Sequence, residues 1–454
     1  MTKKLLVIGG DAAGMSAASQ ARRLLDPDEL AITVIERGDT TSYAACGIPY
    51  WVAGLIPERE ALIARRAEVF RTEQQIDVRL HHEAVALDTA ARTATVRDLT
   101  TDTMHTFTYD DLLIAVGAEQ VHPPVEGLDT PGVFGVQTLH DGQQILDAMD
   151  ARRPRHAVVV GGGYIGLEMA EAMQLRGLDV TLIDMASRPM TTLEPVLGDR
   201  IADAMRTMGV DLRLDTPLTG FDVGEDGWVS GVVTPDGTIA TDLVVLGTGV
   251  RPRSGLAAAA GIPVGPSGGI VTDSRQATPV PGVWAAGDCA ETLHRVSGSP
   301  VSFALGTVAN KQGRIAGLNL GGSVGHFPGV LGTAVTKIHD LEIARTGLSL
   351  REAEAAGLHA TVTSITAGTR AHYYPDGTPM TVLLIVEHDS GRLLGGQIVG
   401  GPGAGKRIDT IAAALWNGMV VEDLVQMDLA YAPPFSPVWD PVLTAARRAT
   451  GSAG

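Results

Sequence analysis

Two glycine-rich turns, about 150 residues apart, constrain the fold of this 454-residue chain more than any other feature. The first turn, GGDAAG at 9–14, lies between an apolar strand predicted over 5–8 and a helix of small residues predicted over 15–25. The next predicted strand, 31–35, ends in Glu36, 27 residues after the first glycine. A glycine turn between a strand and a helix, with an acid at the end of the following strand, is typical of a Rossmann-type dinucleotide site.

The same arrangement occurs a second time. The turn GGGYIG at 161–166 follows a strand predicted over 156–160 and precedes a helix predicted over 167–176. The next predicted strand, 180–183, ends in Asp184, 23 residues after the first glycine of this turn. The repetition predicts two dinucleotide-binding domains in one chain.

The two turns differ in how fully they match the fingerprint. The second turn has all three glycines, Gly161, Gly163 and Gly166. The first turn has Gly9 and Gly14, with Asp11 where the middle glycine is expected. Glycines at these positions let backbone N–H groups and the positive end of the helix approach a pyrophosphate. We therefore expect the Asp11 side chain to point away from a bound pyrophosphate.

A buried strand pattern at 109–117 ends in glycine, and a matching pattern lies at 242–252, so both dinucleotide units close with the same kind of strand. Residues after about 325 contain no fingerprint, and the segments 383–386 and 393–399 are predicted to form a hairpin in a mixed sheet. The sequence therefore predicts an α/β fold with two Rossmann-like domains and a C-terminal α+β domain.

Charge and cysteine content exclude several classes of function. A formal net charge of −17 argues against a nucleic-acid surface. The chain starts with too short an apolar run for a signal peptide, and no later apolar stretch is long enough to span a membrane. The two cysteines form no disulfide framework, so we expect a cytoplasmic protein. Adjacent His81 and His82 face opposite sides of a strand, and we assign no metal.

The run PGVWAAGD at 281–288, together with the two turns, resembles the FAD-dependent pyridine nucleotide-disulfide oxidoreductases. The resemblance covers nearly the whole chain. It implies an FAD domain in two parts, 1–115 and 249–325, an NAD(P)H domain at 116–248 and a dimerisation domain at 326–454.

The resemblance also implies cofactor-binding residues. Those for FAD are Gly9, Gly14, Glu36, Asp288, Asn310 and Lys311, and those for NAD(P)H are Gly161, Gly163, Gly166, Glu168 and Asp184. Asp288 is expected to hydrogen-bond a ribityl hydroxyl of FAD. Lys311 occupies the place where the family aims a helix N-terminus at the flavin N1–C2=O edge. Asp184 favours NADH, with NADPH as the alternative, because an acid accepts from a ribose 2′-hydroxyl and repels a 2′-phosphate.

Cys46 determines the branch of the family. Thr41 and Trp51, five positions on either side, leave Cys46 without a disulfide partner. The chain therefore resembles the single-cysteine branch, and most of all its coenzyme A-disulfide reductases. We expect a helix that starts near Cys46 and Gly47 to lower the thiol pKa, and we expect Cys289 to be a packing residue.

Two further features separate the subclasses of this branch. Ala12 occupies the position where its peroxidases and water-forming oxidases have a histidine. Tyr431, in AYAPPFS, matches a tyrosine of the coenzyme A-disulfide reductases that reaches the active cysteine of the other subunit, and Tyr373 matches its companion. These two tyrosines are predicted to be catalytic, together with Cys46. The alternative is that they anchor a subunit interface.

The substrate is less narrowly defined. Gln20, Arg23 and Ser42 fall where the coenzyme A-disulfide reductases contact the coenzyme. The chain has Ala45 where that group often has asparagine, and Gln74 where a basic residue helps to hold the coenzyme. Another low-molecular-weight disulfide, a persulfide or a polysulfide therefore remains an alternative.

The resemblance implies a homodimeric flavoenzyme in which NAD(P)H reduces FAD, and FAD reduces a disulfide through Cys46. Coenzyme A disulfide is the first candidate substrate. The alternatives are an NAD(P)H oxidase, a persulfide or polysulfide reductase, and a non-catalytic flavin redox sensor. We expect no nucleic-acid or membrane partner.

Overall fold

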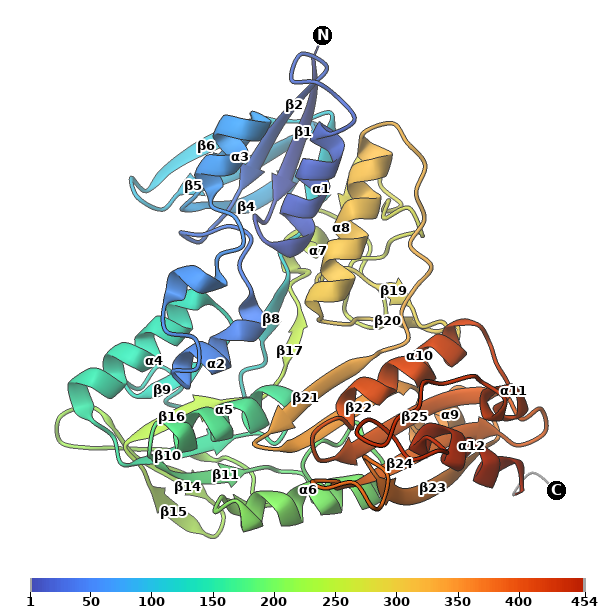
Figure 1. The fold of residues 1–454 in the computed structure, drawn as a ribbon. Coiled ribbons are helices and arrows are strands. Elements are labelled where there is room, and N and C mark those ends of the chain that lie inside the picture. The colour runs from blue at the N-terminus through green and yellow to red at the C-terminus, as the bar shows by residue number, and fades with distance from the viewer. Residues whose placement is uncertain (1, 452–454) are drawn as a thin grey trace.

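The computed structural model describes residues 2–451 and shows two α/β domains followed by a C-terminal sheet domain (Figure 1). The first domain is built on a five-stranded parallel sheet. Its strands, in spatial order, are β18 (Val283–Ala285), β7 (Asp111–Ile114), β1 (Lys3–Ile8), β2 (Leu30–Ile35) and β3 (Asp77–Arg79). Because β18 follows the second domain in sequence, the chain leaves this sheet after β7 and returns to it later.

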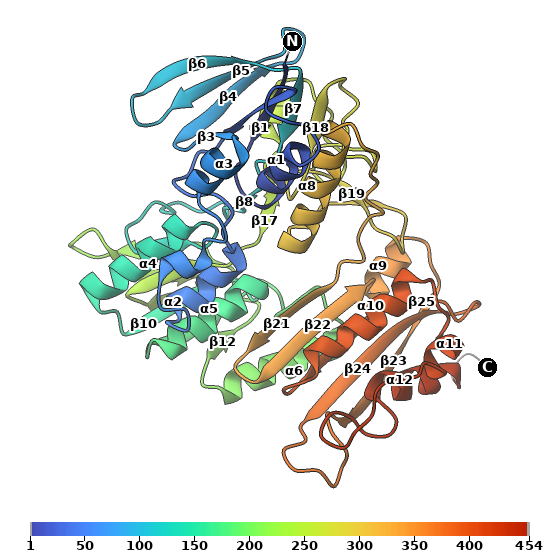
Figure 2. The same cartoon turned by 45° about the horizontal axis from the view of Figure 1, so that its top comes forward.

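Two helices from distant parts of the chain pack side by side on this sheet. They are α1 (Ala12–Arg22), which follows the first glycine turn, and α8 (Gly306–Leu320) (Figures 1 and 2). Small residues allow the close approach, because a Cβ atom added at Gly313 would lie 2.2 Å from the Ala13 carbonyl oxygen.

Smaller elements complete the first domain. They are η1 (Ala45–Gly47), α2 (Ile48–Val52), η2 (Arg59–Leu62), α3 (Ala67–Gln74), the antiparallel strands β4 (His82–Asp88), β5 (Thr93–Asp98) and β6 (Thr103–Thr108), α7 (Gly255–Ala259), and the paired strands β19 (Thr292–Leu293) and β20 (Pro300–Val301).

The second domain repeats the architecture of the first. Its five parallel strands, in spatial order, are β12 (Asp211–Arg213), β11 (Asp179–Ile183), β10 (His156–Val160), β16 (Leu243–Leu246) and β9 (Val133–Gly135). The other elements are α4 (Leu139–Arg152), α5 (Tyr164–Leu175), α6 (Pro195–Thr207) and the antiparallel strands β13 (Gly220–Val223), β14 (Val229–Thr234) and β15 (Gly237–Ala240). The chain enters and leaves this domain through two paired strands, β8 (Ala118–Gln120) and β17 (Val250–Pro252). The domain boundaries inferred from the sequence stay a proposal.

The C-terminal domain is one five-stranded sheet with helices packed against it (Figure 2). Its strands, in spatial order, are β21 (Ala334–Ile338), β22 (Leu341–Gly347), β25 (Leu393–Gly400), β24 (Pro379–Glu387) and β23 (Ala360–Gly368). The remaining elements are α9 (Leu350–Ala355), η3 (Gly405–Arg407), α10 (Ile408–Trp416), α11 (Val421–Val425) and α12 (Pro441–Thr450).

The predicted hairpin of this domain forms, because Leu383 on β24 pairs with Gln397 on β25. The prediction of a mixed sheet was wrong, because every strand pair of this sheet is antiparallel. The reason is the connectivity. β21 and β22 form one hairpin, β23 to β25 form a meander, and the two units join through the antiparallel pair β22–β25.

Both fingerprint helices start earlier than predicted. α1 begins at Ala12 and α5 at Tyr164, inside the glycine turns, so the first free N–H groups of each helix belong to the turn itself. α1 also ends earlier than predicted, at Arg22, whose guanidinium donates to the carbonyl oxygens of Leu25 (2.9 Å) and Leu30 (2.7 Å).

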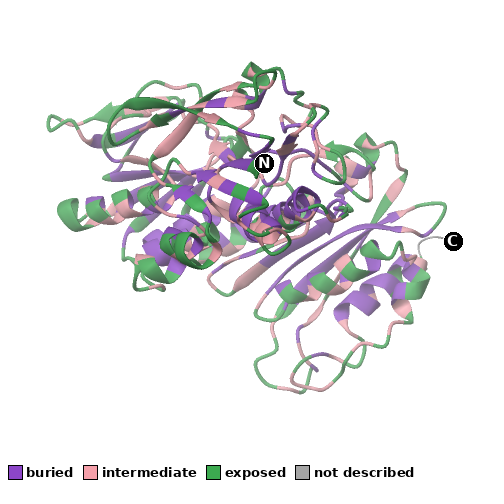
Figure 3. Ribbon diagram, turned by 90° about the horizontal axis from the view of Figure 1, so that it is seen from above, coloured by how far each residue is buried: buried purple, intermediate pink, exposed green. Residues whose placement is uncertain are grey.

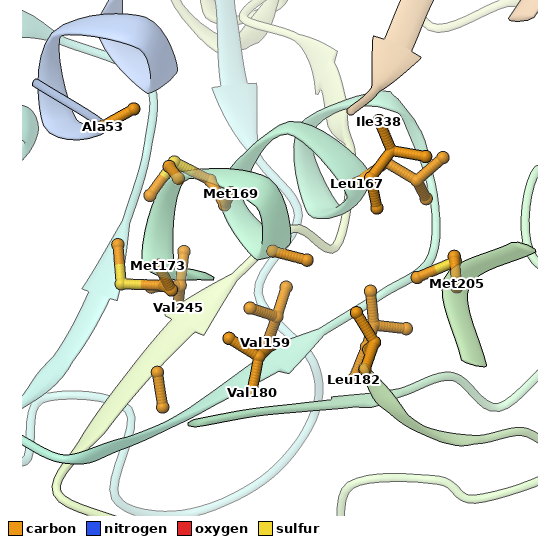
Figure 4. Packing of buried hydrophobic residues seen from close by; sticks show 14 of the residues in the cluster. Ala53, Val159, Leu167, Met169, Met173, Val180, Leu182, Met205, Val245 and Ile338 are labelled. Carbon is orange, nitrogen blue, oxygen red and sulfur yellow. The ribbon is translucent and has the colours of Figure 1, made fainter. Parts of the chain in front are cut away.

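Buried segments run through the sheets and the helices that pack on them, whereas exposed residues lie in connecting loops and also on the outer parts of helices and strands, β6 among them (Figure 3). One hydrophobic core crosses domain boundaries. Ala53, at the end of α2, packs with Met169 and Met173 of α5, and Ile338 of β21 packs near Leu167 (Figure 4). The segment that follows Cys46 therefore shares an interior with the second dinucleotide domain and with the C-terminal sheet.

Candidate active site

The two glycine turns have nearly the same geometry. Gly9 has φ 107° and Gly161 has φ 104°, a backbone conformation that favours glycine. A Cβ atom at Gly14 would lie 1.9 Å from the Gly9 carbonyl oxygen, and one at Gly166 would lie 1.8 Å from the Gly161 carbonyl oxygen. A Cβ atom at Gly163 would meet no atom of the described chain within 4 Å. The middle position of the second turn thus leaves room for a ligand to approach the backbone.

An acid at the end of the next strand lies against each turn. The Glu36 carboxylate accepts from the Gly10 N–H at 2.6 Å, and the Asp184 carboxylate accepts from the Gly162 N–H at 2.6 Å. These equivalent contacts hold both carboxylates against the backbone of their glycine turns. Their predicted contacts with ribose hydroxyls stay predictions.

Asp11 lies at the start of α1 and faces the segment that carries Cys46. Its Oδ1 accepts from the Tyr43 N–H at 3.1 Å. Burial raises the pKa of Asp11 to about 7, and the nearby carboxyls of Glu36 and Asp288 also raise it.

Asp288 has an unsatisfied oxygen. Its Oδ1 is buried and has no hydrogen-bond partner in the described residues 2–451, and burial raises its pKa to about 6. Gly287 before it has φ 83° and donates its N–H to Gln312 Oε1 at 2.8 Å, which ties this turn to α8. A buried carboxyl oxygen without a donor fits a ligand hydroxyl, and FAD offers one on its ribityl chain.

The structure corrects one expectation at α8. This helix begins at Gly306, so Lys311 lies in its second turn, and the free N-terminal amides belong to residues near Gly306. Asn310 joins two helices, because its Oδ1 accepts from Ser16 Oγ at 2.8 Å and its Nδ2 donates to the Gly306 carbonyl at 2.8 Å.

Cys46 lies in η1 and is exposed. The expectation that a helix N-terminus lowers its pKa was wrong. Partial burial of the thiol raises the pKa of Cys46, as do the nearby carboxyls of Glu168 and Asp288. The following helix α2 begins at Ile48 and has only five residues. Cys289 is fully buried, as expected of a packing residue.

Glu168 belongs to a polar stripe on α5 that contacts the C-terminal domain. Three residues, spaced about one turn apart, each bind one residue of β21 or of the turn after it. Glu168 accepts from Thr336 (2.8 Å), Glu171 pairs with Lys337 (2.7 Å) and Gln174 bonds His339 (2.8 Å). The predicted position of Glu168 near a nicotinamide stays a prediction.

The two predicted catalytic tyrosines meet, although they are 58 positions apart in sequence. The hydroxyls of Tyr373 and Tyr431 lie 3.3 Å apart, and this hydrogen bond raises the pKa of Tyr431. The side chains stay largely accessible, with 64% of Tyr373 and 45% of Tyr431 exposed. The β23–β24 connection that carries Tyr373 lies across the molecule from α2 in both views (Figures 1 and 2). The pair is therefore remote from Cys46 of the same chain.

The three predicted substrate residues fall into two places. Arg23 donates to Gln20 Oε1 at 3.4 Å, at the C-terminal end of α1. Ser42 lies at the other end of α1, where its N–H donates to the Gly10 carbonyl oxygen at 3.2 Å. No group of three or more histidine, cysteine or acidic side chains that suits a metal occurs within residues 2–451.

The sequence interpretation missed Tyr50 and Gln312. Tyr50 lies on α2, and burial together with the carboxyls of Glu168 and Glu171 raises its pKa to about 12. The sequence signal that could have pointed to Tyr50 is its position four residues after Cys46. Gln312 is 1% exposed, and its contact with Gly287 is too distant in sequence to predict.

The fold and site define a flavoprotein with two dinucleotide domains and one accessible thiol. The description "pyridine nucleotide-disulphide oxidoreductase" matches residues 3–313, and the dimerisation domain of the same family matches residues 333–441. The chain therefore belongs to the pyridine nucleotide-disulphide oxidoreductase family, and it is an FAD-dependent NAD(P)H oxidoreductase.

Individual relatives support this assignment along the whole chain. The chain is 40% identical over 449 residues to the NAD(P)H coenzyme A polysulfide/persulfide reductase of Pyrococcus horikoshii, with 98% of each chain covered. It superposes on the reduced CoADR-RHD of Bacillus anthracis with a TM-score of 0.95 at 33% identity, covering 100% of this chain and 81% of the other. It superposes on the NAD-dependent persulfide reductase of A. fulgidus with a TM-score of 0.94 at 36% identity, covering 99% and 83%. The predicted fold class and cofactors are confirmed. No helix in residues 2–451 is both long and apolar enough to cross a bilayer.

Proposed function

We propose that this protein uses NAD(P)H to reduce the sulfur–sulfur bond of a low-molecular-weight disulfide or persulfide, with Cys46 as the reacting thiol. One observation carries the proposal. Cys46 is the exposed cysteine, between the FAD glycine turn and the nicotinamide domain, and the second cysteine, Cys289, is 0% exposed. An accessible thiol without an internal partner reacts with a disulfide that comes from outside the chain.

The proposed chemistry balances at Cys46. The thiolate attacks one sulfur of the substrate, which forms a mixed disulfide at Cys46 and releases one thiolate. The mixed disulfide then takes up two electrons, which frees the second thiolate and restores the Cys46 thiolate. FAD, when bound, carries these two electrons from NAD(P)H to sulfur. Overall, one disulfide, one NAD(P)H and one proton give two thiols and NAD(P)⁺.

Tyr373 and Tyr431 supply the proton for the departing thiolate in this proposal. A protonated phenol donates a hydrogen bond to a departing thiolate and can pass it a proton. Because the tyrosine pair is remote from Cys46 of its own chain, it serves Cys46 of the partner subunit. The proposal therefore includes a homodimer, which the matched dimerisation domain supports.

The substrate and cofactor preferences belong to the same proposal. The names of the relatives favour a substrate linked to coenzyme A, and Gln20, Arg23 and Ser42 are its proposed contacts. NADH is the favoured donor because Asp184 lies at the mouth of the second turn. The remaining residues inferred from the resemblance are proposed to bind the cofactors. For FAD they are Gly9, Gly14, Glu36, Asp288, Asn310 and Lys311, and for NAD(P)H they are Gly161, Gly163, Gly166 and Glu168. Because both cysteines are free, we place the protein in a reducing compartment, the cytoplasm.

Three measurements on the FAD-loaded protein test this proposal. NADH oxidation is followed with coenzyme A disulfide, with coenzyme A persulfide and with oxygen alone. For Cys46→Ser we expect disulfide turnover to fall by at least about 100-fold, because a hydroxyl does not form the mixed disulfide. Reduction of the flavin by NADH is expected to persist. Cys289→Ala is the matched control and keeps turnover. Undiminished disulfide reduction by Cys46→Ser refutes the proposal, and oxygen consumption that exceeds reduction of both sulfur substrates identifies an oxidase.

Intact-mass analysis identifies the thiol partner. We expect the oxidised protein to carry a small thiol on Cys46 that a reductant removes, and we expect no such mass on Cys46→Ser. The added mass names the thiol directly, whether it is coenzyme A or another.

A further inference from the structure

Asp11 has no role in the function proposed above, although it replaces a fingerprint glycine. Its Oδ1 accepts from the Tyr43 N–H at 3.1 Å, three residues before Cys46. The Ser42 N–H beside it donates to the Gly10 carbonyl oxygen at 3.2 Å. Two hydrogen bonds therefore attach the start of the Cys46 segment to the FAD glycine turn.

The other end of this segment is attached to the nicotinamide domain. Arg176, at the end of α5, donates its Nε–H to the Val52 carbonyl oxygen at 2.6 Å. Trp51 and Val52 are buried in the core shared with α5. Cys46 lies between the two attachments, in a three-residue η1 turn that has no buried side chain. At the start of the segment, Tyr43 packs at the edge of the same core and the Ala44 N–H donates to the Leu62 carbonyl oxygen at 2.8 Å. The contact of Asp11 with Tyr43 adds a side-chain link from this end to the FAD glycine turn.

The surroundings of Asp11 contain acids. Glu36 lies at the end of β2, Asp288 follows β18, and the phenol of Tyr43 and the thiol of Cys46 lie on the attached segment. Within residues 2–451, no hydrogen bond or ion pair joins Asp11 to a cationic side chain. Burial raises the pKa of Cys46 most, followed by the carboxyls of Glu168 and Asp288, and a negative charge on Asp11 adds to their effect in disfavouring the thiolate.

We propose that Asp11 is a positioning residue for Cys46. Its carboxyl holds the start of the Cys46 segment against the FAD glycine turn, and its charge suppresses the thiolate form of Cys46. The inference deepens the proposed function by adding a residue that acts on its reacting thiol. The backbone contact and the charge effect are nevertheless measurable whatever the substrate is.

Two substitutions separate the two effects. Asp11→Asn keeps an acceptor oxygen toward Tyr43 and removes the charge, whereas Asp11→Ala removes both. Asp88→Ala is the matched control, because Asp88 is an acid elsewhere in the chain that accepts from the N–H groups of Ala90 and Ala91 at 3.0 and 2.8 Å. All variants are compared with FAD bound, and flavin absorbance reports their loading.

Hydrogen exchange of the Tyr43 amide tests the attachment. We expect exchange about tenfold faster in Asp11→Ala, which corresponds to the loss of one partly buried hydrogen bond, and near-unchanged exchange in Asp11→Asn and Asp88→Ala. Equal protection of this amide in Asp11→Ala and the wild type overturns the positioning role.

The charge effect is tested on protein whose Cys46 has been freed by a reductant that is then removed. The measurement is the pH dependence of Cys46 alkylation by iodoacetamide, read by intact mass. We expect the midpoint to fall by a few tenths of a pH unit up to about one unit in Asp11→Asn, and to stay unchanged in Asp88→Ala. An unmoved midpoint in Asp11→Asn overturns the charge effect. If Asp11→Ala fails to fold, Asp11→Asn still decides this point. Both readouts remain valid even if Cys46→Ser retains disulfide turnover, so failure of the inference is distinguishable from failure of the proposed function.

Discussion

At the scale of single residues, the site gathers carboxyl groups around one thiol. Burial raises the pKa of Asp11 to about 7 and that of Asp288 to about 6, and Glu168 and Asp288 raise the pKa of Cys46. Cys46 is thus less acidic than a thiol at a helix N-terminus. Its reactivity depends on groups from elsewhere, and the flavin and the partner subunit are the sources that the family provides.

We predict that FAD binding weakens as the pH falls through about 6. The ionised carboxylate of Asp288 accepts a ligand hydroxyl more strongly than the neutral acid does, and protonation removes this advantage. For Asp288→Asn we expect a Kd for FAD about tenfold higher at pH 8, and a shallower change between pH 8 and pH 5. Flavin fluorescence on dilution measures both. Asp273→Asn, which changes an acid that accepts from the Arg275 N–H, is the control. Parallel pH curves for Asp288→Asn and the wild type contradict the prediction.

At the scale of elements, the sequence predicted what local pattern controls. The glycine turns, their flanking strands and the β24–β25 hairpin follow from spacing and periodicity over a few residues. The antiparallel order of the C-terminal sheet depends on the pairing of β22 with β25, which are separated by the whole of β23 and β24. Glu168 and Asp288, which act on Cys46, come from positions more than 100 residues away in sequence. Such contacts leave no periodic signal in the sequence.

The close packing of α1 and α8 leads to a prediction at this scale. In Gly313→Ala the added methyl group would lie 2.2 Å from the Ala13 carbonyl oxygen, so we expect α8 to shift and the free energy of unfolding to fall by about 1–3 kcal/mol. Gly306→Ala, on the same helix, is the matched control, because no atom of the described chain lies within 4 Å of its added methyl group. Urea denaturation and FAD content measure the effect. Equal stability of the two variants contradicts the close approach.

At the scale of the whole molecule, the proposed reaction requires two chains. The hydroxyls of Tyr373 and Tyr431 meet at 3.3 Å on the C-terminal domain, and Cys46 lies across the molecule beside α2. In the proposed dimer, one protomer supplies the thiol of a complete site, and its partner supplies the phenols.

Mixed dimers test this arrangement. One protomer carries Cys46→Ser, and the other carries Tyr373→Phe with Tyr431→Phe. Each parent dimer is expected to be nearly inactive. Random mixing gives about half mixed dimers, each with one intact site, so we expect about a quarter of wild-type disulfide turnover. No recovery above the parents, in dimers verified by size and mass, shows that the tyrosines act within their own chain or not at all.

The core shared by α2, α5 and β21 affects how such proteins are re-engineered. If the nicotinamide domain came from a relative, the side chains of its α5 would not match those of α2 and β21 in the shared core. We expect a lower melting temperature for chimeras whose crossovers fall within this shared core. Exchanges that move α2, α5 and β21 together are expected to keep the stability of the parent.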